Sequence, residues 1–521
     1  MTAVSFSKIW SKIKPYFLII VIGLTLYGRI VFFDFSYLDD NALILDNHYI
    51  LSDVRNIGLV LSSDVFFSTD RNYYRPLLNL SLMLDTAIGG TNPLVFHLCN
   101  ILLHLLASIL VFLLFKKIGS NKNLSLFLAL IFLVHPALTQ AVAWIPGRND
   151  SLLAIMVLGA WLSVLSFFSR PRLASYLFYL GLFWLALLTK ETAIVLPILV
   201  AFYAVISRPV NFWRTERWLL AVGSGVIIFF WLIMRQLALG INSPGVIKVF
   251  LSILSNIEGV LLYIGKLLLP FNLGVFPILA DSSLFYGILS LVILLTFILT
   301  SRQRFSARIY FGIAWFGLFL LPSFVRLVGL PDFLEHRAYL SFVGFLIIIS
   351  EIDWVKRIDW RRKIVIVIAG CIIISLSLLS FYHSSDFRNR LTFWQAAVKI
   401  SPHSPMSQRN LGVMHYFQKD FELAIEHYKI AISLNEREPM VHNNLGVIYL
   451  EQKRYEEAEK EFLLELAVNP NYDKALFNLG ESYYFREQKT EAAHFWQEAL
   501  AVNPSHVEAR QRLLIWQNQI Q

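Results

Sequence analysis

The amino-acid sequence predicts an all-α protein in two parts, a domain with many membrane spans followed by a soluble domain of helical repeats. Three observations support this fold class. Hydrophobic residues make up 56% of the 521 residues and charged residues only 16%, whereas soluble domains have about 45–50% and about 25%. Apolar runs follow one another up to Phe381, and the polar sequence after them repeats every 34 residues. We therefore place the membrane domain at 1–381 and the repeat domain at 382–521.

This composition excludes a soluble enzyme, a disordered protein and a disulfide-rich secreted domain as descriptions of the whole chain. The two cysteines, Cys99 and Cys371, lie in apolar runs and are expected to pack as small hydrophobic side chains. The net charge is +9, but it is unevenly distributed. From Tyr382 onward there are 15 basic and 18 acidic residues, while the preceding residues include 30 basic and 18 acidic ones. The basic excess lies in short loops between apolar runs, which favours the positive-inside rule over nucleic-acid binding.

About eleven spans are expected in the membrane domain. They cover residues 15–33, 94–115, 123–143, 151–168, 173–189, 192–206, 218–238, 284–300, 308–324, 338–350 and 364–381. The apolar stretch 246–270 carries Lys248, Glu258 and Lys266, so we expect an interfacial helix or a re-entrant element there. If it does not span, every second loop is basic. The N-terminus is then cytoplasmic, and the loop 34–75 and the whole repeat domain face outward.

The repeat domain is predicted to be a tetratricopeptide-repeat (TPR) solenoid of three repeats, with a half-repeat around Trp394 before them and a capping helix at about 505–519. Small residues keep the 34-residue period because two helices must approach closely there, and aromatic residues are expected to fill the gap to the next repeat. We expect the concave face of this solenoid to bind an acceptor or partner protein. The periodic positions are Gly412, Gly446 and Gly480, Ala424, Ala458 and Ala492, and Tyr428, Phe462 and Trp496.

Two adjacent carboxylates, Asp39 and Asp40, follow the first span in the outward loop. Neighbouring like charges raise the pKa of one of them, which suits proton abstraction from a hydroxyl. The pair can supply a general base, a ligand such as Asp40 for a divalent metal (Mg or Mn), or both. The alternative is a solvated loop in which Asp40 caps a helix.

Arginines lie on the same predicted side of the membrane. Arg71, Arg75 and Arg148 are outward, and a guanidinium binds phosphate through two parallel hydrogen bonds. For Arg75 the alternative is an interfacial side chain that reaches the lipid headgroups. For Arg148 the alternative is a structural role beside Asp150. Both alternatives remain open at this point.

Three further polar positions face similar alternatives. His97 shares a helix face with Asn100 and His104, where hydrogen bonding between helices competes with ligand binding. Lys190 and the glutamate after it are either a salt-bridged hairpin tip or part of a site. Arg337 opens a late span together with Glu335, so helix capping competes with ligand binding. Arg326 is a further outward arginine.

Carboxylates and arginines thus collect on one side, while the other side shows only basic loops. No Walker or Rossmann glycine motif is present, so a soluble nucleotide donor is not expected. The layout favours a phosphate-linked lipid donor used at the outer surface. Arginines would hold its phosphate, and a carboxylate would deprotonate the acceptor hydroxyl.

The chain resembles the transmembrane and tetratricopeptide-repeat O-mannosyltransferases, which are GT-C membrane glycosyltransferases, and their bacterial relatives. The resemblance covers nearly the whole chain and rests on Tyr37-Leu38-Asp39-Asp40, Tyr74-Arg75-Pro76-Leu77, Phe96-His97 with Asn100 and His104, His135-Pro136 with Thr139, Gly147-Arg148 with Asp150, Lys190-Glu191 and the C-terminal repeats. It implies inverting transfer of a sugar, often mannose, from a polyprenyl- or dolichyl-phosphate donor to Ser or Thr of proteins. By the same match, Asp39 and Asp40 form the catalytic motif, Arg75 and Arg148 contact phosphate, and Arg337 belongs to a late arginine motif.

One position departs from the family pattern. Where the family usually has Thr-Glu-Ala-Val, this chain has Thr139-Gln140-Ala141-Val142. A glutamine is neither a base nor an anionic metal ligand. This departure supports the alternative of a non-catalytic, membrane-anchored TPR scaffold. A separate alternative keeps the chemistry but transfers the sugar to a cell-surface glycan or lipid. We expect a multi-pass protein of a bacterial plasma membrane, with the endoplasmic reticulum membrane as the alternative.

Overall fold

The computed structural model describes residues 3–68, 73–206, 215–240, 245–302, 306–325 and 332–520. Throughout these ranges the chain is helical and forms no strand, only an isolated bridge between Ile278 and Asp332. The all-α prediction is confirmed. Arg71 and Arg326 lie outside the described residues. Contacts divide the chain into two units, Met1–Phe393 and Trp394–Gln521.

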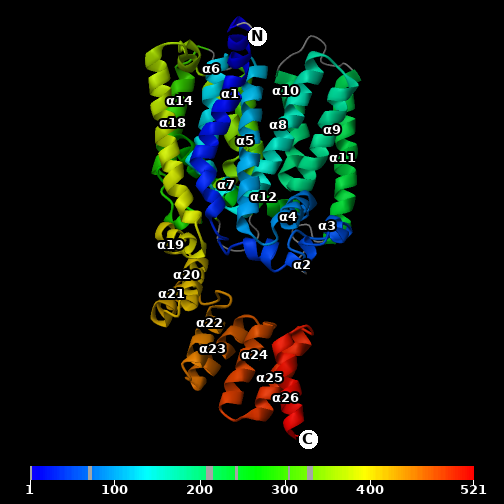
Figure 1. The fold of residues 1–521 in the computed structure, drawn as a ribbon, viewed down its shortest axis with the longest axis vertical. Helices are drawn as coiled ribbons and strands as arrows, with labels where there is room; N and C mark the ends of the chain where they lie inside the picture. The colour runs from blue at the N-terminus through cyan, green and yellow to red at the C-terminus, as the bar shows by residue number, and fades with distance from the viewer. Residues whose placement is uncertain are drawn as a thin grey trace. The chain divides into compact units, whose positions relative to one another are not determined.

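The first unit is a bundle of helices, many of which run alongside one another (Figure 1). Its longer helices are α1 (Ala3–Tyr27), α4 (Pro76–Gly89), α5 (Pro93–Lys117), α6 (Lys122–Val134), α8 (Arg148–Ser169), α9 (Leu173–Thr189), α10 (Leu196–Ile206), α11 (Thr215–Leu239), α12 (Val246–Ser255), α13 (Gly259–Leu268), α14 (Phe285–Leu299), α15 (Ala307–Leu320), α16 (Ser341–Glu351) and α18 (Lys363–Ser384). The short ones are α2 (His48–Leu51), α3 (Ile57–Ser62), α7 (Gln140–Ala143) and α17 (Asp353–Arg357).

Six helices in the described part of the chain are long and apolar enough to cross a membrane, or up to eight if each of two bent pairs is one span. The pair Lys122–Val134 and Pro136–Ala143 bends by 55°, and the pair Ile247–Ser255 and Gly259–Leu268 bends by 51°. The second pair occupies the stretch expected to be interfacial or re-entrant. Four shorter apolar helices, Leu173–Thr189, Glu191–Ile206, Phe285–Leu299 and Ser341–Glu351, fall in the remaining predicted ranges. The chain is a multi-pass membrane protein, and the count of eleven spans stays a prediction.

Loops lie at both ends of this bundle (Figure 1). In Figure 1 the N-terminus lies at one end and α2, α3 and α4 at the other. At the N-terminal end, the Asn123 amide donates to the carbonyl of Trp360 (3.1 Å), and the backbone N–H of Arg302 donates to Asp353 (2.7 Å). At the far end, the backbone N–H of Asp34 donates to the carbonyl of Arg388 (2.9 Å). Which side of the membrane each end faces stays a prediction.

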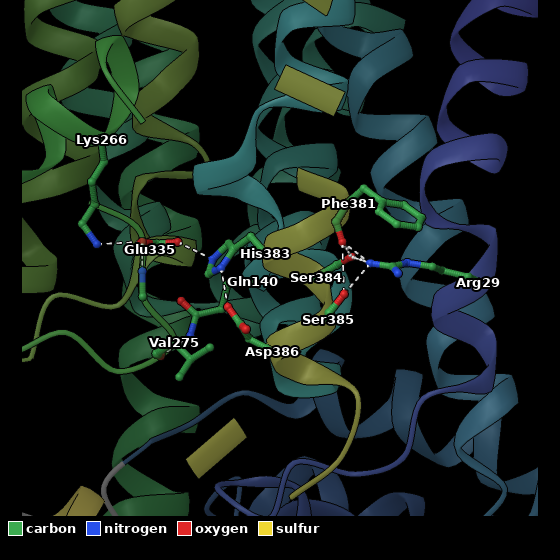
Figure 2. Close-up of polar contacts among 11 residues, drawn as sticks. Arg29, Gln140, Lys266, Val275, Glu335, Phe381, His383, Ser384, Ser385 and Asp386 are labelled. Atoms are coloured by element: carbon green, nitrogen blue, oxygen red, sulfur yellow. Dashed lines mark hydrogen bonds and ion pairs between the residues drawn. The ribbon is translucent and has the colours of Figure 1, made fainter. Parts of the chain in front are cut away.

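The first and last helices of the bundle are joined by Arg29, in the 3-10 turn η1 (Gly28–Phe32) that extends α1. Its guanidinium donates to the carbonyl of Phe381 and to the hydroxyls of Ser384 (2.7 Å) and Ser385 (2.9 Å), as Figure 2 shows. It also stacks over the Phe381 ring, 3.4 Å from the centroid. The helix α18 therefore belongs to the first unit beyond Phe381, and the contacts divide the chain twelve residues after the predicted boundary.

The second unit begins within α19 (Arg390–Ile400) and continues as three helix pairs and a last helix. These are α20 (Pro405–Phe417) with α21 (Phe421–Leu434), α22 (Val441–Glu451) with α23 (Tyr455–Val468), α24 (Asp473–Phe485) with α25 (Lys489–Val502), and α26 (Val507–Ile520). The turns inside the pairs place Lys419, Lys453 and Glu487 at φ of 62°, 61° and 65°, again 34 residues apart. The predicted TPR fold is confirmed.

The periodic glycines of this unit are needed for close approach of the paired helices. A Cβ on Gly446 would lie 2.5 Å from Cε1 of Phe462, and one on Gly412 would lie 2.6 Å from Cε1 of Tyr428. Each aromatic ring thus presses on the glycine of its own repeat. Tyr428 also packs in a cluster with Val441 and Leu445 of the next repeat, so it serves both contacts.

Candidate active site

The two predicted carboxylates lie in a tight turn between η1 and the π-helical turn Asn41–Leu45. Tyr37 has a φ of 64°, a left-handed conformation that is uncommon outside glycine and is often found at functional sites. Asp39 is partly exposed, whereas Asp40 is fully buried. Asp40 accepts hydrogen bonds from the backbone N–H (3.1 Å) and the hydroxyl of Ser36. It stands at the N-cap of the following turn, but its side chain makes no capping hydrogen bond.

Both carboxylates are shifted toward the protonated form. Burial raises the pKa of Asp39 to about 6, and the charges of Asp40 and Asp332 add to this while Arg75 opposes it. Burial also raises the pKa of Asp40 to about 6, against the hydrogen bonds from Ser36. A carboxylate with a pKa near 6 is still ionised at neutral pH and is a better proton acceptor than an exposed aspartate.

Arg75 and Lys190 are held beside this turn by carboxylates from distant loops. Arg75 is the N-cap of α4, and its Nε donates to Glu191 Oε2 (3.1 Å), while the backbone N–H of Tyr74 donates to Glu191 Oε1 (3.2 Å). Lys190 Nζ donates to Asp150 Oδ1 (2.7 Å). The charge of Arg75 acts on both Asp39 and Asp150, so these loops form one cluster. Lys190 and Glu191 thus bind loops far from their own hairpin.

Arg337 and its neighbour His336 reach the same cluster from the 3-10 turn η9 (Glu335–Ala338). Arg337 Nη1 donates to the carbonyl (2.7 Å) and to Oδ1 (3.0 Å) of Asp332, the carboxylate that also acts on Asp39. His336 Nε2 lies 3.8 Å from Asp150 Oδ2, and its ring packs beside Trp144 with 5.2 Å between centroids. The structure therefore brings together Asp39, Arg75, Lys190 and Arg337.

Arg148 lies deeper, at the start of α8, and is fully buried. Its Nε donates to Asn100 Oδ1 (2.7 Å), its Nη2 donates to the carbonyl of Phe96 (2.8 Å), and its Nη2 pairs with Asp85. These partners come from α4 and α5. The geometry therefore fits a structural role, and phosphate binding by Arg148 stays a prediction.

The polar face predicted on α5 is largely used for contacts between elements. The Asn100 amide donates to the carbonyls of Val142 (3.3 Å) and Ile145 (3.2 Å). His104 Nδ1 lies 2.7 Å from the Tyr339 hydroxyl. His97 is buried beside the ring of Phe33. The structure does not place it against Asp39, so substrate binding by His97 also stays a prediction.

Sequence reasoning missed the partners of several charged residues at this end of the bundle. Asp85 pairs with Arg148, and Asp332 holds Arg337. Glu335 accepts from Lys266 (2.7 Å) and lies 2.9 Å from His383 Nε2 in α18. A single charge within an apolar run, as at Asp85 and Lys266, is a signal that a partner must exist, although it does not identify the partner. Asp332 carries no such signal.

A divalent metal bound by Asp40 was one of the alternatives for the carboxylate pair. Among the residues that the structure describes, no group of three or more His, Cys, Asp or Glu side chains lies together as metal ligands do. Asp39 and Asp40 alone do not complete an oxygen-ligand shell. The metal requirement stays a prediction, and no chemical step below uses one.

The sequence of the first unit matches a known family over part of its length. Residues 75–234 match the model of dolichyl-phosphate-mannose-protein mannosyltransferases. This segment contains Arg75, His97, Arg148 and Lys190, while Asp39 lies before it. Residues 409–475 and 473–506 match two models of tetratricopeptide repeats.

Curated relatives include protein O-mannosyl-transferases of animals. The chain is 38% identical over 138 residues to mouse TMTC1, covering 24% of this chain and 15% of the relative. It is 35% identical over 162 residues to Drosophila Tmtc1 (30% and 19%) and 38% identical over 136 residues to human TMTC2 (25% and 16%). The alignments thus span less than a fifth of these relatives.

Solved structures that resemble the chain include TPR domains. The first TPR domain of Spaghetti (RPAP3) bound to an HSP90 peptide is 22% identical and covers 22% of this chain and 92% of its own, with a TM-score of 0.22. MamA from Desulfovibrio magneticus is 19% identical and covers 25% and 73%, with a TM-score of 0.23. The mannosyltransferase-type segment, the curated relatives and the C-terminal repeats together show that this chain is similar to the transmembrane and tetratricopeptide-repeat O-mannosyltransferases.

Proposed function

We propose that the chain is a membrane glycosyltransferase that moves a mannose-like sugar from a polyprenyl- or dolichyl-phosphate to hydroxyl groups of proteins. The observation that carries this proposal is the cluster of Asp39, Arg75, Lys190 and Arg337 at one end of the bundle. It combines a carboxylate of raised pKa with three cations, each held by a carboxylate. The names of the relatives and of the matching family support the same reaction class.

Asp39 is the better candidate for the general base. Asp40 is fully buried and bound to Ser36, whereas Asp39 is partly exposed and can meet an acceptor hydroxyl. In the proposed step, the acceptor oxygen attacks the anomeric carbon of the sugar while Asp39 takes the hydroxyl proton. The bond from the anomeric carbon to the phosphate oxygen breaks, and its electron pair leaves with the lipid phosphate. Asp40 shapes the turn and, through its charge, keeps Asp39 basic.

Arg75 and Lys190 are the candidates for binding the lipid phosphate, because their side chains are 19% and 13% exposed and lie in the same cluster as Asp39. Cations held in place before the reaction stabilise the charge that develops on the leaving phosphate. Arg337, which is paired with Asp332, is a third cation in this cluster. Arg148 joins α8 to α5 and to α4, the helix whose N-cap is Arg75.

The acceptor or a partner protein would bind the concave face of the TPR unit, as extended helical solenoids do. With the basic loops on the cytoplasmic side, the cluster and the TPR unit would face outward from a bacterial plasma membrane. The endoplasmic reticulum membrane remains the alternative location. Transfer to a glycan or lipid is the alternative acceptor, and a non-catalytic scaffold is the alternative function.

The test uses membranes that contain the full chain and a radiolabelled polyprenyl-phosphate mannose. Label should reach the protein fraction with the wild type, vanish with Asp39→Asn, and persist with the matched control Asp46→Asn, an exposed aspartate of the same loop. Label in the lipid or glycan fraction instead would favour the alternative acceptor. Equal label with Asp39→Asn and wild type, or no label from any donor, would favour the scaffold.

A further inference from the structure

Gln140, the position where the chain departs from its family, is fully buried at the start of α7. Its side-chain Nε2 donates to the carbonyl of Val275 (3.0 Å), and its Oε1 accepts from the backbone N–H of His336 (3.1 Å). Figure 2 shows the Gln140 side chain pointing at Val275, beside the Glu335 network. One side-chain amide therefore joins two backbone segments that are about 60 residues apart in sequence.

These two segments also bind each other. The backbone N–H of Phe333 donates to the carbonyl of Pro277 (2.9 Å), and the backbone N–H of Gly274 donates to Glu335 Oε1 (2.8 Å). Glu335 is further tied to Lys266 and His383 (Figure 2). Gln140 thus holds the turn η9 at the backbone of His336, and the side chain of Glu335 anchors the residue before it. This turn carries His336 and Arg337 to the candidate active site.

The pattern at Gln140 needs one donor and one acceptor on the same planar group. An amide supplies both, whereas an ionised carboxylate only accepts and would set its oxygen against the carbonyl of Val275. A protonated carboxyl group again has one O–H donor and one acceptor oxygen, so it can replace the amide. A glutamate would fit this position only while it holds a proton.

We propose that Gln140 is a positioning residue whose neutral amide holds η9 against the Val275 segment. In this proposal, the glutamine does not mark the loss of a catalytic base at position 140. The hydrogen-bonding role is testable by stability alone, while the effect on transfer rests on the proposed function. In this arrangement a glutamate at 140 makes the hold on η9 dependent on pH, and the natural glutamine removes that dependence.

Several titratable and charged side chains lie on the elements packed against α7, and all of them are the same in every variant. They are His97 and His104 on α5, His135 before the turn Pro136–Leu138, Arg148 and Asp150 on α8, and Glu335, His336 and Arg337 on η9. Every comparison is therefore made against the wild type at the same pH, so that only the group at position 140 differs.

The experiment measures the melting temperature of the full chain in detergent between pH 5 and pH 9. Gln140→Glu should melt close to the wild type at pH 5 and at least about 5 °C below it at pH 9, since a buried carboxyl loses its proton within this range. Gln140→Leu should melt below the wild type by the same margin at every pH. Gln418→Glu, on an exposed glutamine, should follow the wild type throughout. A pH-independent gap for Gln140→Glu, or none, overturns the proposal.

Label transfer separates this inference from the proposed function. The rate of label transfer by Gln140→Glu should be at least about tenfold below that of the wild type between pH 6 and pH 9. If the substitution instead restored a catalytic base, the rate would rise. A gain overturns the positioning role. The expected melting pattern without any transfer by the wild type would keep the hydrogen-bonding role and reject the glycosyltransferase. Transfer by the wild type without the expected melting pattern would keep the glycosyltransferase and reject the hydrogen-bonding role of Gln140.

Discussion

Replacing Arg148 by methionine tests whether this arginine is part of the scaffold or a contact for phosphate. Methionine keeps an unbranched apolar stem of similar length but removes the charge and all the donors. In the structure those donors serve Asp85, Asn100 and the carbonyl of Phe96, and Arg148 has no exposed surface. The variant should therefore lose stability first, and transfer only as a consequence.

The size of the stability loss follows from the buried Asp85 carboxylate, which remains without its partner in Arg148→Met. Asp85 is only 2% exposed, and removing one partner of a buried ion pair costs about 3–5 kcal/mol. Burial raises the pKa of Asp85 and Arg148 opposes that shift. Without the arginine the carboxyl takes up a proton, which limits the loss to this range. The double variant Asp85→Leu/Arg148→Met removes both charges and should regain part of the stability.

The assay heats equal amounts of the full-length variants in detergent and measures the fraction that remains monodisperse. Arg148→Met should lose half of its monodisperse fraction at a clearly lower temperature than the wild type, and the double variant should lie between them. A variant that is as stable as the wild type but binds the lipid donor more weakly would refute the reasoning and make Arg148 a phosphate contact. A double variant no better than the single one would show that the pair with Asp85 is not the source of the loss.

Three further predictions concern other parts of the chain. Because the pKa of Asp39 is about 6 and a base must be ionised, transfer should rise with pH between about 5 and 7; a flat profile there would exclude Asp39 as the base. Gly446→Ala should lower the free energy of unfolding by about 1–3 kcal/mol through the clash with Phe462, and limited proteolysis within the TPR unit should become faster. Gly370→Ala, with open space around it, should change neither. Burial disfavours ionised Glu335, but Lys266 and His383 lower its pKa to about 2. The ionised carboxylate therefore contributes roughly 3 kcal/mol to the free energy of unfolding above pH 4.5, and this contribution is lost as the pH falls toward 2. Acid melting curves of Glu335→Gln should lack this loss, and an unchanged acid limb would count against the assignment.

Much of the architecture could be predicted because it depends on periodic or strongly polar signals. The 34-residue period alone located the close contacts at Gly412 and Gly446. The alternation of basic and acidic loops predicted that Asp39, Arg75 and Lys190 would share one end of the bundle. The number of spans was harder, because apolar helices such as Ser341–Glu351 are shorter than a bilayer requires, and hydropathy does not show where such a helix ends.

The partners of the charged residues could not be predicted. Arg148 stands in a Gly-Arg-Asn-Asp stretch that looks like an exposed loop, yet α8 begins at Arg148 and buries it under α4 and α5. Lys190 and Glu191 look like a pair with each other, but they bind Asp150 and Arg75, which lie 40 and 116 residues away in sequence. Such contacts depend on how the helices pack, and a local pattern contains no record of that packing.

The contact between Arg29 and the end of α18 has a consequence for the order of assembly during synthesis. Its partners Phe381, Ser384 and Ser385 are made at least 352 residues later. At about 5–20 residues per second, the ribosome needs about 20–70 s to supply them. The turn that holds Asp39 has the same delay, since Asp34 is anchored by the carbonyl of Arg388. The nascent chain therefore completes this end of the bundle only as the TPR unit begins to emerge, and a chain cut short before Arg388 lacks the anchor.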